Sequence, residues 1–173
     1  KDEGVNYEWD LHSNSILGGQ EAFFSEGRRV LDYGSGKGIA AKQINDTFGE
    51  SMCTSLDYRY VHPDEDSLNK EMSVAGDSRK LPFKNDSFDR ILSVESFPAW
   101  LPNDPIKFCA TFREITRISK KGTIWRGTLP TYEEYEREKF STYEILNEMC
   151  KNGREVYIHK GRKYFVAKLI EKN

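Results

Sequence analysis

The sequence lacks several features that would decide its class at once. It has no run of about 18 apolar residues, the length that a membrane-spanning helix needs. Its 26 basic and 28 acidic residues nearly cancel, so no overall charge favours nucleic acid or a membrane surface. Only three cysteines occur, Cys53, Cys109 and Cys150, far apart and without C-x-x-C spacing. We therefore expect no disulfide framework and no metal site, and we expect a reducing, cytoplasmic location.

The chain also lacks internal repeats, low-complexity tracts and linkers. Its 173 residues suffice for one domain, and they are too few for two of ordinary size. We expect a single domain over residues 1–173, with residues 1–25 as a short N-terminal lid and residues 26–173 as the core. The sequence starts at Lys1, so it does not establish the natural N-terminus, and it leaves the oligomeric state open.

What the chain does contain is an alternation of short apolar runs with helical stretches. The runs expected to form strands are residues 30–32, 52–56, 72–75, 90–94 and 123–129, with a closing hairpin over 155–159 and 164–170. The stretches expected to form helices are residues 39–48, a segment that opens at Pro105, and residues 131–150. Strands that alternate with helices predict an α/β three-layer sandwich, with a mainly parallel sheet and an antiparallel terminal hairpin.

The strongest local signal is the string D-x-G-x-G-x-G from Asp32 to Gly38, between the first strand and the first helix. Glycines there permit positive φ and let a ligand approach the backbone closely. In an open parallel sheet, ligands bind outside the carboxyl ends of the strands. The position therefore suits a nucleotide-like ligand, although a tight turn without a ligand remains an alternative.

Two other glycine motifs fit this turn less well. A phosphate-binding P-loop requires G-x-x-x-x-G-K-[ST], but Leu31 stands at its first glycine and Gly38 at its Ser or Thr. A dinucleotide fingerprint, G-x-G-x-x-G, needs a third glycine where this chain has Ile39. Asp57 ends the second predicted strand, where a carboxylate can accept hydrogen bonds from two ribose hydroxyls. An adenosine ligand is thus favoured, but Asp57 does not choose between cofactors.

The choice comes from the segment after the third strand. The string GD-x3-LPF-x4-FD from Gly76 to Asp89 resembles motifs of class I S-adenosylmethionine-dependent methyltransferases. The likeness is greatest to the small-molecule, type 11 branch, which includes ubiquinone and menaquinone biosynthesis enzymes. It extends to the segment from Glu114 to Gly122, which is similar to that family's E-x2-R helix end. The resemblance implies a Rossmann-like fold with strand order 3-2-1-4-5-7-6 and strand seven antiparallel.

The same resemblance implies S-adenosyl-L-methionine as cofactor and assigns its binding residues. These are Asp32, Gly34, Ser35, Gly36, Asp57, Tyr58, Gly76, Asp77, Ser78, Ser93 and Val94. Asp32 and the turn would receive the methionine end, and Asp57 would hold the ribose. Tyr58 would flank the adenine, and Asp77 would accept from its amino group. Ser93 and Val94 would border both cofactor and acceptor.

The acceptor side is less defined, because the chain lacks the long insertions that usually cover the acceptor in this family. Aromatic residues that could line a substrate pocket are Tyr7, Phe97 and Trp100, since aromatic faces suit a sulfonium or a flat acceptor. His12 and Glu95 are weak candidates for a general base; the catalytic residues stay unknown.

Several functions remain open at this point. The string Ser93-Val94-Glu95-Ser96 stands where exocyclic-amine nucleic-acid methyltransferases carry N-P-P-Y, so a nucleic-acid substrate is disfavoured. We predict a methyltransferase for a small-molecule acceptor, with no membrane partner. The alternatives are a non-catalytic domain that binds the cofactor or a partner, and an oxidoreductase that uses a nicotinamide nucleotide.

Overall fold

A computed structural model of the chain describes residues 23–24, 28–49, 52–57, 73–94, 96–97, 105–128, 154–158 and 164–169. In chain order, their elements are β1 (Val30–Tyr33), α3 (Ile39–Phe48), β2 (Cys53–Asp57), β3 (Ser73–Ala75), β4 (Phe88–Ser93), α4 (Pro105–Ile118), β5 (Ser119–Thr128), β6 (Arg154–Ile158) and β7 (Tyr164–Leu169). The helix expected over 131–150 lies outside the described residues, as does the expected lid over residues 1–25 except for Phe23 and Phe24.

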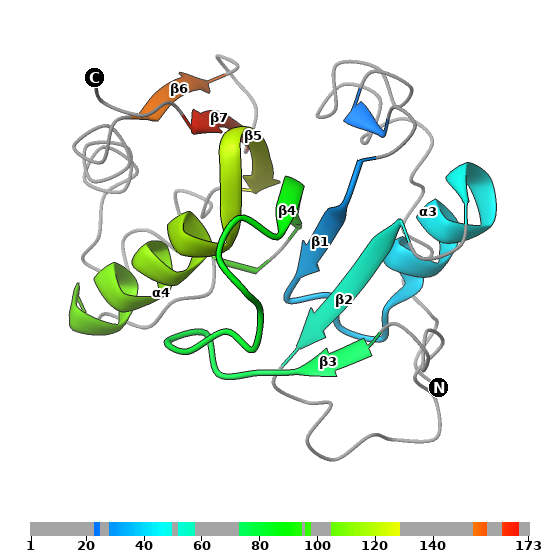
Figure 1. Cartoon of the computed structure of the whole chain (residues 1–173), viewed down its shortest axis with the longest axis horizontal. Helices are drawn as coiled ribbons and strands as arrows, with labels where there is room; N and C mark the ends of the chain where they lie inside the picture. The colour runs from blue at the N-terminus through cyan, green and yellow to red at the C-terminus, as the bar shows by residue number, and fades with distance from the viewer. Residues whose placement is uncertain are drawn as a thin grey trace.

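The strands form one sheet in the order β3-β2-β1-β4-β5-β7-β6, which is the order implied by the family resemblance (Figure 1). β1 to β5 pair in parallel with their neighbours in the sheet. β7 runs antiparallel to both β5 and β6. Because the strand order reverses between β1 and β4, their carboxyl ends flank the point where open α/β sheets bind ligands.

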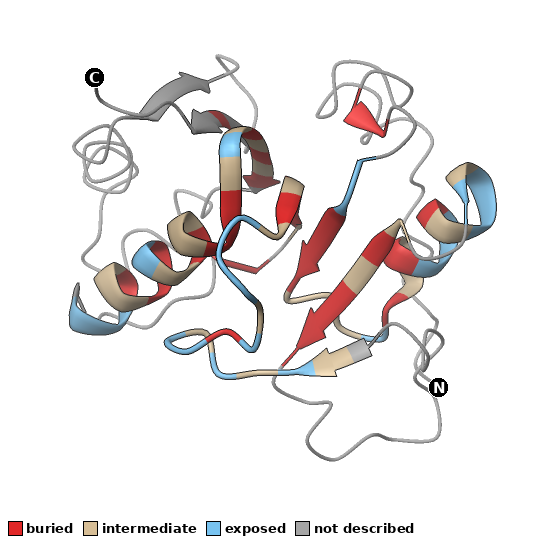
Figure 2. Ribbon diagram, in the orientation of Figure 1, coloured by how far each residue is buried: buried red, intermediate tan, exposed pale blue. Residues whose placement is uncertain are grey.

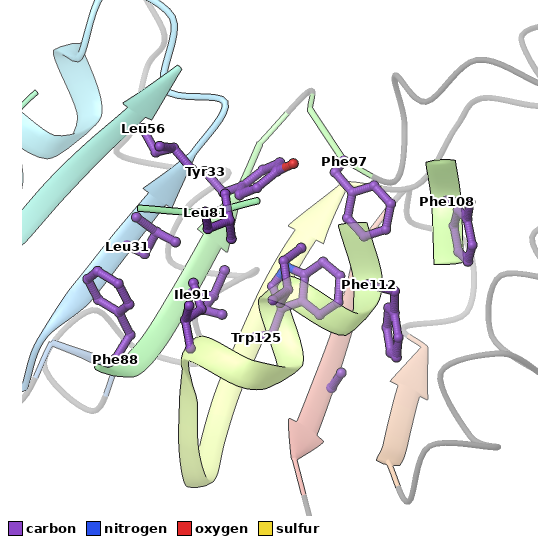
Figure 3. Close-up of a cluster of buried hydrophobic side chains, with 13 residues drawn as sticks. Leu31, Tyr33, Leu56, Leu81, Phe88, Ile91, Phe97, Phe108, Phe112 and Trp125 are labelled. Carbon is purple, nitrogen blue, oxygen red and sulfur yellow. The ribbon is translucent and has the colours of Figure 1, made fainter. Parts of the chain in front are cut away.

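Two helices cover opposite faces of this sheet and pack on it through two hydrophobic clusters. Along both helices, buried residues alternate with exposed ones (Figure 2). On the α4 face, alternate strand residues such as Leu31, Ile91 and Trp125 pack on that helix (Figure 3). On the other face, their neighbours Val30 and Leu92 pack with α3. The alternation follows from the two-residue period of a strand. The described residues therefore form three layers, helix, sheet and helix, as expected.

Helix α3 agrees residue for residue with the expected range 39–48. Gly38, with φ of 77°, precedes its first turn, and Gly49, with φ of 127°, ends it. Ala41 and Ile44 face the sheet. The side chain of Asn45 both donates to the carbonyl of Cys53 and accepts its N–H, so the end of the helix is tied to the start of β2.

Strand β5 starts earlier than expected, at Ser119 directly after α4 rather than at Thr123. Its register with β4 shifts, because the step from Phe88 to Arg90 faces the longer step from Ser119 to Ile124. Gly122 lies in this irregular stretch with φ of 78°, a conformation that glycine adopts without strain. Gly122 therefore lies in a bulge inside the strand, which begins before the expected range of 123–129.

The two strings that carry the family resemblance are joined by side chains of α4. The guanidinium of Arg117 donates to the carbonyls of Leu81 (3.0 Å) and Phe83 (2.8 Å) and to Oδ1 of Asn85 (3.0 Å). Glu114 accepts from the N–H of Leu81 (2.8 Å) and pairs with Arg117 (2.7 Å). The E-x2-R string thus fixes the loop before β4. We call Glu114, Arg117 and the loop that they hold the Arg117 lock.

Candidate cofactor site

The glycine turn after β1 takes up the backbone conformation that its sequence predicts. Gly34, Gly36 and Gly38 all have positive φ, at 70°, 59° and 77°. Side chains with a Cβ resist this region, which explains three alternating glycines. The N–H of Gly38 donates to the carbonyl of Ser35, which closes the turn just before α3.

The end of β2 supports one side of this turn. The N–H groups of Gly34 and Ser35 donate to the carbonyl of Leu56, at 2.8 and 3.1 Å. The N–H of Gly36 donates to Oδ2 of Asp57 at 2.9 Å. Asp57 is buried, so its carboxylate lies against the turn rather than out in solvent. The sequence placed Asp57 near a ligand but did not anticipate that it also holds the turn.

Asp32 is a buried carboxylate behind the same turn, with 3% of its surface exposed. It accepts the backbone N–H of Ala41 in the first turn of α3. Its Oδ2 is buried and has no hydrogen-bond partner among the residues that the structure describes. Burial raises the pKa of Asp32 to about 7, the Ala41 N–H opposes this, and the nearby Asp57 carboxylate adds to it. A buried acceptor atom of this kind calls for a donor that a ligand can supply.

The segment just after β4 contacts the turn on the side opposite to β2. The hydroxyl of Ser96 donates to the carbonyl of Tyr33 at 2.6 Å. A Cβ placed on Gly34 would lie only 2.4 Å from Cβ of Ser96, which no real side chain tolerates. Gly34 is therefore required by packing as well as by its backbone angle. In the same strand end, Ser93 accepts a hydrogen bond from the indole N–H of Trp125 at 2.8 Å.

At the end of β3, Gly76 and Asp77 occupy positions with different constraints. A Cβ on Gly76 would lie 2.8 Å from Cδ1 of Leu56 and 3.1 Å from Cδ of Pro82, so a larger residue there would force these side chains to move. Asp77 is exposed and accepts from both the backbone and the guanidinium of Arg79. These hydrogen bonds lower the pKa of Asp77 to about 2. The sequence predicts that Asp77 accepts from adenine, and Arg79 is a partner for it that this prediction did not include.

Tyr33 connects the turn with the segment after β3. Its buried hydroxyl lies beside Ser78 and Thr111, and burial is the main cause that raises its pKa well above the usual value. Its ring packs edge-on against Phe97 at 6.1 Å between centroids. Ser78 is therefore near the turn, as the expected adenine segment requires.

The other predicted site residues pack in the two hydrophobic clusters or lie outside the described residues. Phe97 lies in the core, stacked on Trp125 at 5.5 Å between centroids, so it supports the end of β4 from within (Figure 3). The ring of Phe97 is thus enclosed by other aromatic rings, and its part in a substrate pocket stays a prediction. Val94 is partly buried and packs on the α3 face. The remaining predicted residues lie outside the described residues: Tyr7, His12, Tyr58, Glu95 and Trp100.

The model of a methyltransferase domain family matches residues 31–125, which is more than half of the chain. The chain belongs to this methyltransferase family. The matched range includes every described residue of the site, from Asp32 to Ser96. The class I S-adenosylmethionine-dependent methyltransferase expected from the glycine turn and the GD-x3-LPF-x4-FD string is thereby confirmed.

Two characterised methyltransferases are similar in sequence. A fatty-acid O-methyltransferase from Mycolicibacterium smegmatis is 30% identical over 151 residues, covering 73% of this chain and 52% of that protein. A demethylmenaquinone methyltransferase from Mycolicibacterium paratuberculosis is 24% identical over 130 residues, covering 69% of this chain and 54% of that protein. The chain thus spans about half the length of these relatives.

Solved structures agree on the fold of this methyltransferase domain. A crystal structure of a Pyrococcus horikoshii protein superposes with a TM-score of 0.67 at 16% identity, covering 97% of this chain and 94% of that one. Other structures of similar fold are described as S-adenosylmethionine-dependent methyltransferases. At these identities the likeness shows the Rossmann-like α/β fold, which confirms the expected fold class.

The described part of the domain adds two findings on other classes of site. It contains no group of three or more His, Cys, Asp or Glu side chains arranged to hold a metal ion. None of its helices is long and apolar enough to cross a membrane.

Sequence reasoning missed Ser96 and the hydroxyl of Tyr33 as parts of this site. Their contacts join segments far apart in the chain. The one sequence signal for them was the expectation that Ser93 and Val94, at the end of β4, border the cofactor.

Proposed function

We propose that this domain transfers a methyl group from S-adenosylmethionine to a small-molecule acceptor. The observation that carries the proposal is the pair of buried carboxylates, Asp32 and Asp57, directly behind the glycine turn. Asp32 has an acceptor oxygen without a partner among the described residues, so a ligand that brings a cationic donor would satisfy it.

The charge at this turn separates the proposed cofactor from its main rival. A nicotinamide dinucleotide brings a diphosphate to the glycine turn of its fold. The buried Asp32 carboxylate would repel those phosphate charges, because Coulomb interactions are strong where water is excluded. S-adenosylmethionine instead carries an ammonium and a sulfonium. Ile39, which stands where the dinucleotide fingerprint needs glycine, supports the same choice.

Each part of the cofactor would meet one of the residues predicted to bind it. Asp32 would accept from the α-ammonium of its methionine end, and the N–H groups of the turn would face its carboxylate. Asp57 would accept from the ribose hydroxyls. Asp77 and Ser78 would meet the adenine edge, with Arg79 sharing the Asp77 carboxylate. Tyr58 would flank the adenine ring.

When bound, S-adenosylmethionine supplies an electrophilic methyl group, so the protein's task is alignment and exclusion of water. The turn and the end of β4 would fix where the cofactor lies relative to an acceptor. Ser93 and Val94 would border that place. His12 and Glu95 remain predictions for a general base, which is needed only for an acceptor that is protonated at working pH.

A small-molecule acceptor is supported by the two relatives, one named for fatty acids and the other for demethylmenaquinone. The string Ser93-Val94-Glu95-Ser96 supports it as well, because it lacks the N-P-P-Y pattern of exocyclic-amine methyltransferases.

Transfer can be tested with S-adenosylmethionine labelled at its methyl group and an extract of small metabolites. We expect label in an extract component with the wild-type protein. With Asp32→Asn we expect little, because the variant removes the charge that attracts the cationic cofactor. The matched control is Asp89→Asn, whose carboxylate pairs with Lys120 at the opposite end of β4. Equal labelling by wild type and Asp32→Asn would contradict the assignment, and cofactor binding without any labelling would favour a non-catalytic domain.

A further inference from the structure

Ser96 makes a contact that none of the sequence motifs explains. Its side chain is buried, with 7% of the residue exposed, and its hydroxyl donates to the carbonyl of Tyr33 at 2.6 Å. Tyr33 is the last residue of β1, so this hydrogen bond reaches the peptide group that opens the glycine turn. Gly34 lies against the same side chain, since a Cβ there would approach Cβ of Ser96 to 2.4 Å.

The residues around Ser96 are themselves held firmly. Phe97 stacks on Trp125 with an interplanar angle of 11°, and it also contacts Phe108. The indole of Trp125 donates to Ser93, the last residue of β4. The segment that carries Ser96 is therefore fastened to the core on both sides, and it can act as a fixed support.

The glycine turn thus rests on two supports of unequal strength. On the β2 side, three backbone N–H groups donate to Leu56 and Asp57. On the β4 side, the described contacts are one hydroxyl and the packing of Ser96 on Gly34. If the proposed function holds, the cofactor contacts this turn and the acceptor lies past β4. Ser96 then links the turn that contacts the cofactor with the strand end beside the acceptor.

We propose that Ser96 is a positioning residue, whose hydroxyl holds the glycine turn at the distance from the end of β4 that cofactor binding needs. It acts through the Tyr33–Gly34 peptide and need not touch the cofactor. This inference rests on the proposed function only in that the turn binds S-adenosylmethionine.

Ser119 provides a matched control within the same domain. Its hydroxyl donates to the carbonyl of Ile115 at 2.6 Å, and 6% of the residue is exposed. It lies where α4 passes into β5, at the opposite end of the sheet from the turn. Ser119→Ala and Ser96→Ala therefore remove hydrogen bonds of the same type, length and burial, and they differ in which segment loses its support.

The experiment compares amide hydrogen exchange and cofactor binding in these two variants. In the free protein, Ser96→Ala should speed exchange of the Gly34, Ser35 and Gly36 amides, while Ser119→Ala should leave them at the wild-type rate. By titration calorimetry, Ser96→Ala should raise the Kd for S-adenosylhomocysteine about tenfold, the effect of one buried hydrogen bond. Ser119→Ala should change that Kd less than about twofold. Both variants should lose similar thermal stability.

A steric exchange tests the contact itself. Gly34→Ala forces a Cβ into Ser96, and adding Ser96→Gly removes the obstructing atoms. The double variant should regain part of the melting temperature that Gly34→Ala alone loses, as a non-additive coupling between touching residues. Additive losses would show that the two side chains do not meet.

The outcomes separate the two proposals. If the wild-type protein fails to bind S-adenosylhomocysteine, the proposed function fails, and the exchange of the turn amides still decides the role of Ser96. If the turn amides exchange alike in Ser96→Ala and Ser119→Ala, the positioning role is wrong. It is also wrong if the two variants bind S-adenosylhomocysteine equally well.

Discussion

The glycine turn and the Arg117 lock are both rich in family motifs, but they differ in how well their polar groups are satisfied. In the lock, Arg117 and Glu114 find partners on Leu81, Phe83 and Asn85. At the turn, three glycines hold positive φ and a buried oxygen of Asp32 has no partner among the described residues. A buried acceptor without a partner, beside a turn whose backbone favours glycine, marks a region built to receive a ligand, whereas a closed network marks a region built to hold the fold.

This contrast changes how the family resemblance should be used. The motifs of both regions lie within the range that the family model matches, and neither shows from its letters which residues meet a ligand. The structure assigns the GD-x3-LPF-x4-FD string two parts. Gly76, Asp77 and Ser78 lie near the turn, and the LPF part belongs to the lock. The contacts that each motif residue makes therefore distinguish residues that can bind a ligand from residues that hold the fold.

The largest effect should come from adding a methyl group at Gly34. Gly34→Ala combines a left-handed backbone with a collision against Ser96, and we expect it to cost about 2–4 kcal/mol of stability and to abolish cofactor binding. Gly122 has a similar φ of 78° but open space around it, so Gly122→Ala should cost only about 1 kcal/mol. Chemical denaturation measures both. Equal losses would show that Ser96 does not constrain the turn.

A smaller but more specific effect is expected at Asp57. Asp57→Ala should weaken S-adenosylmethionine binding by about 1.5–3 kcal/mol, because it removes charge-assisted hydrogen bonds to the ribose and the support of the Gly36 N–H. Titration calorimetry gives the affinity, and circular dichroism checks that the variant is folded. A folded variant with wild-type affinity would mean that the ribose lies elsewhere.

Substitutions in the Arg117 lock should lower the stability of the domain and leave cofactor affinity almost unchanged. Arg117→Ala leaves the carbonyls of Leu81 and Phe83 without their donor, so we expect a loss of about 2 kcal/mol in the free energy of unfolding. Cofactor affinity should change less than about twofold. Arg79→Ala is the control, since its ion pair with Asp77 is exposed and should be worth less than about 0.5 kcal/mol of stability. A large loss of affinity in Arg117→Ala would remove the distinction between lock and turn.

Much of the fold could be predicted because its signals are local. The glycines from Gly34 to Gly38, the span of α3 and the approximate place of each described strand follow from turn residues and apolar periodicity. The family strings added the strand order and the placement of Asp32 and Asp57. The alternation of strands with helices also implied a sheet covered on both faces, as α3 and α4 show.

Contacts between segments that are far apart in the sequence could not be predicted. Ser96 meets Gly34, and Arg117 meets Phe83, only after the chain has folded. The packing of Phe97 against Trp125 and Phe108 could not be read from the sequence either, because an aromatic residue after a strand has the same signal whether it packs in the core or lines a pocket. Burial also decides that Asp32 titrates unlike an ordinary aspartate.

The central claim is that the turn, backed by Asp32, receives a cationic adenosine ligand. It is tested most directly by titrating S-adenosylhomocysteine, which carries the same α-ammonium, and NADH into the wild type and Asp32→Asn across pH. Because the pKa of Asp32 is raised to about 7 and the ammonium favours its ionised form, binding should release a proton. Wild-type affinity for S-adenosylhomocysteine should then rise about tenfold per pH unit below about pH 7 and level off above it. Asp32→Asn should bind more weakly, without this dependence, and NADH should not bind. Tight NADH binding, or affinity for S-adenosylhomocysteine that is unaffected by pH and by Asp32→Asn, would contradict the account.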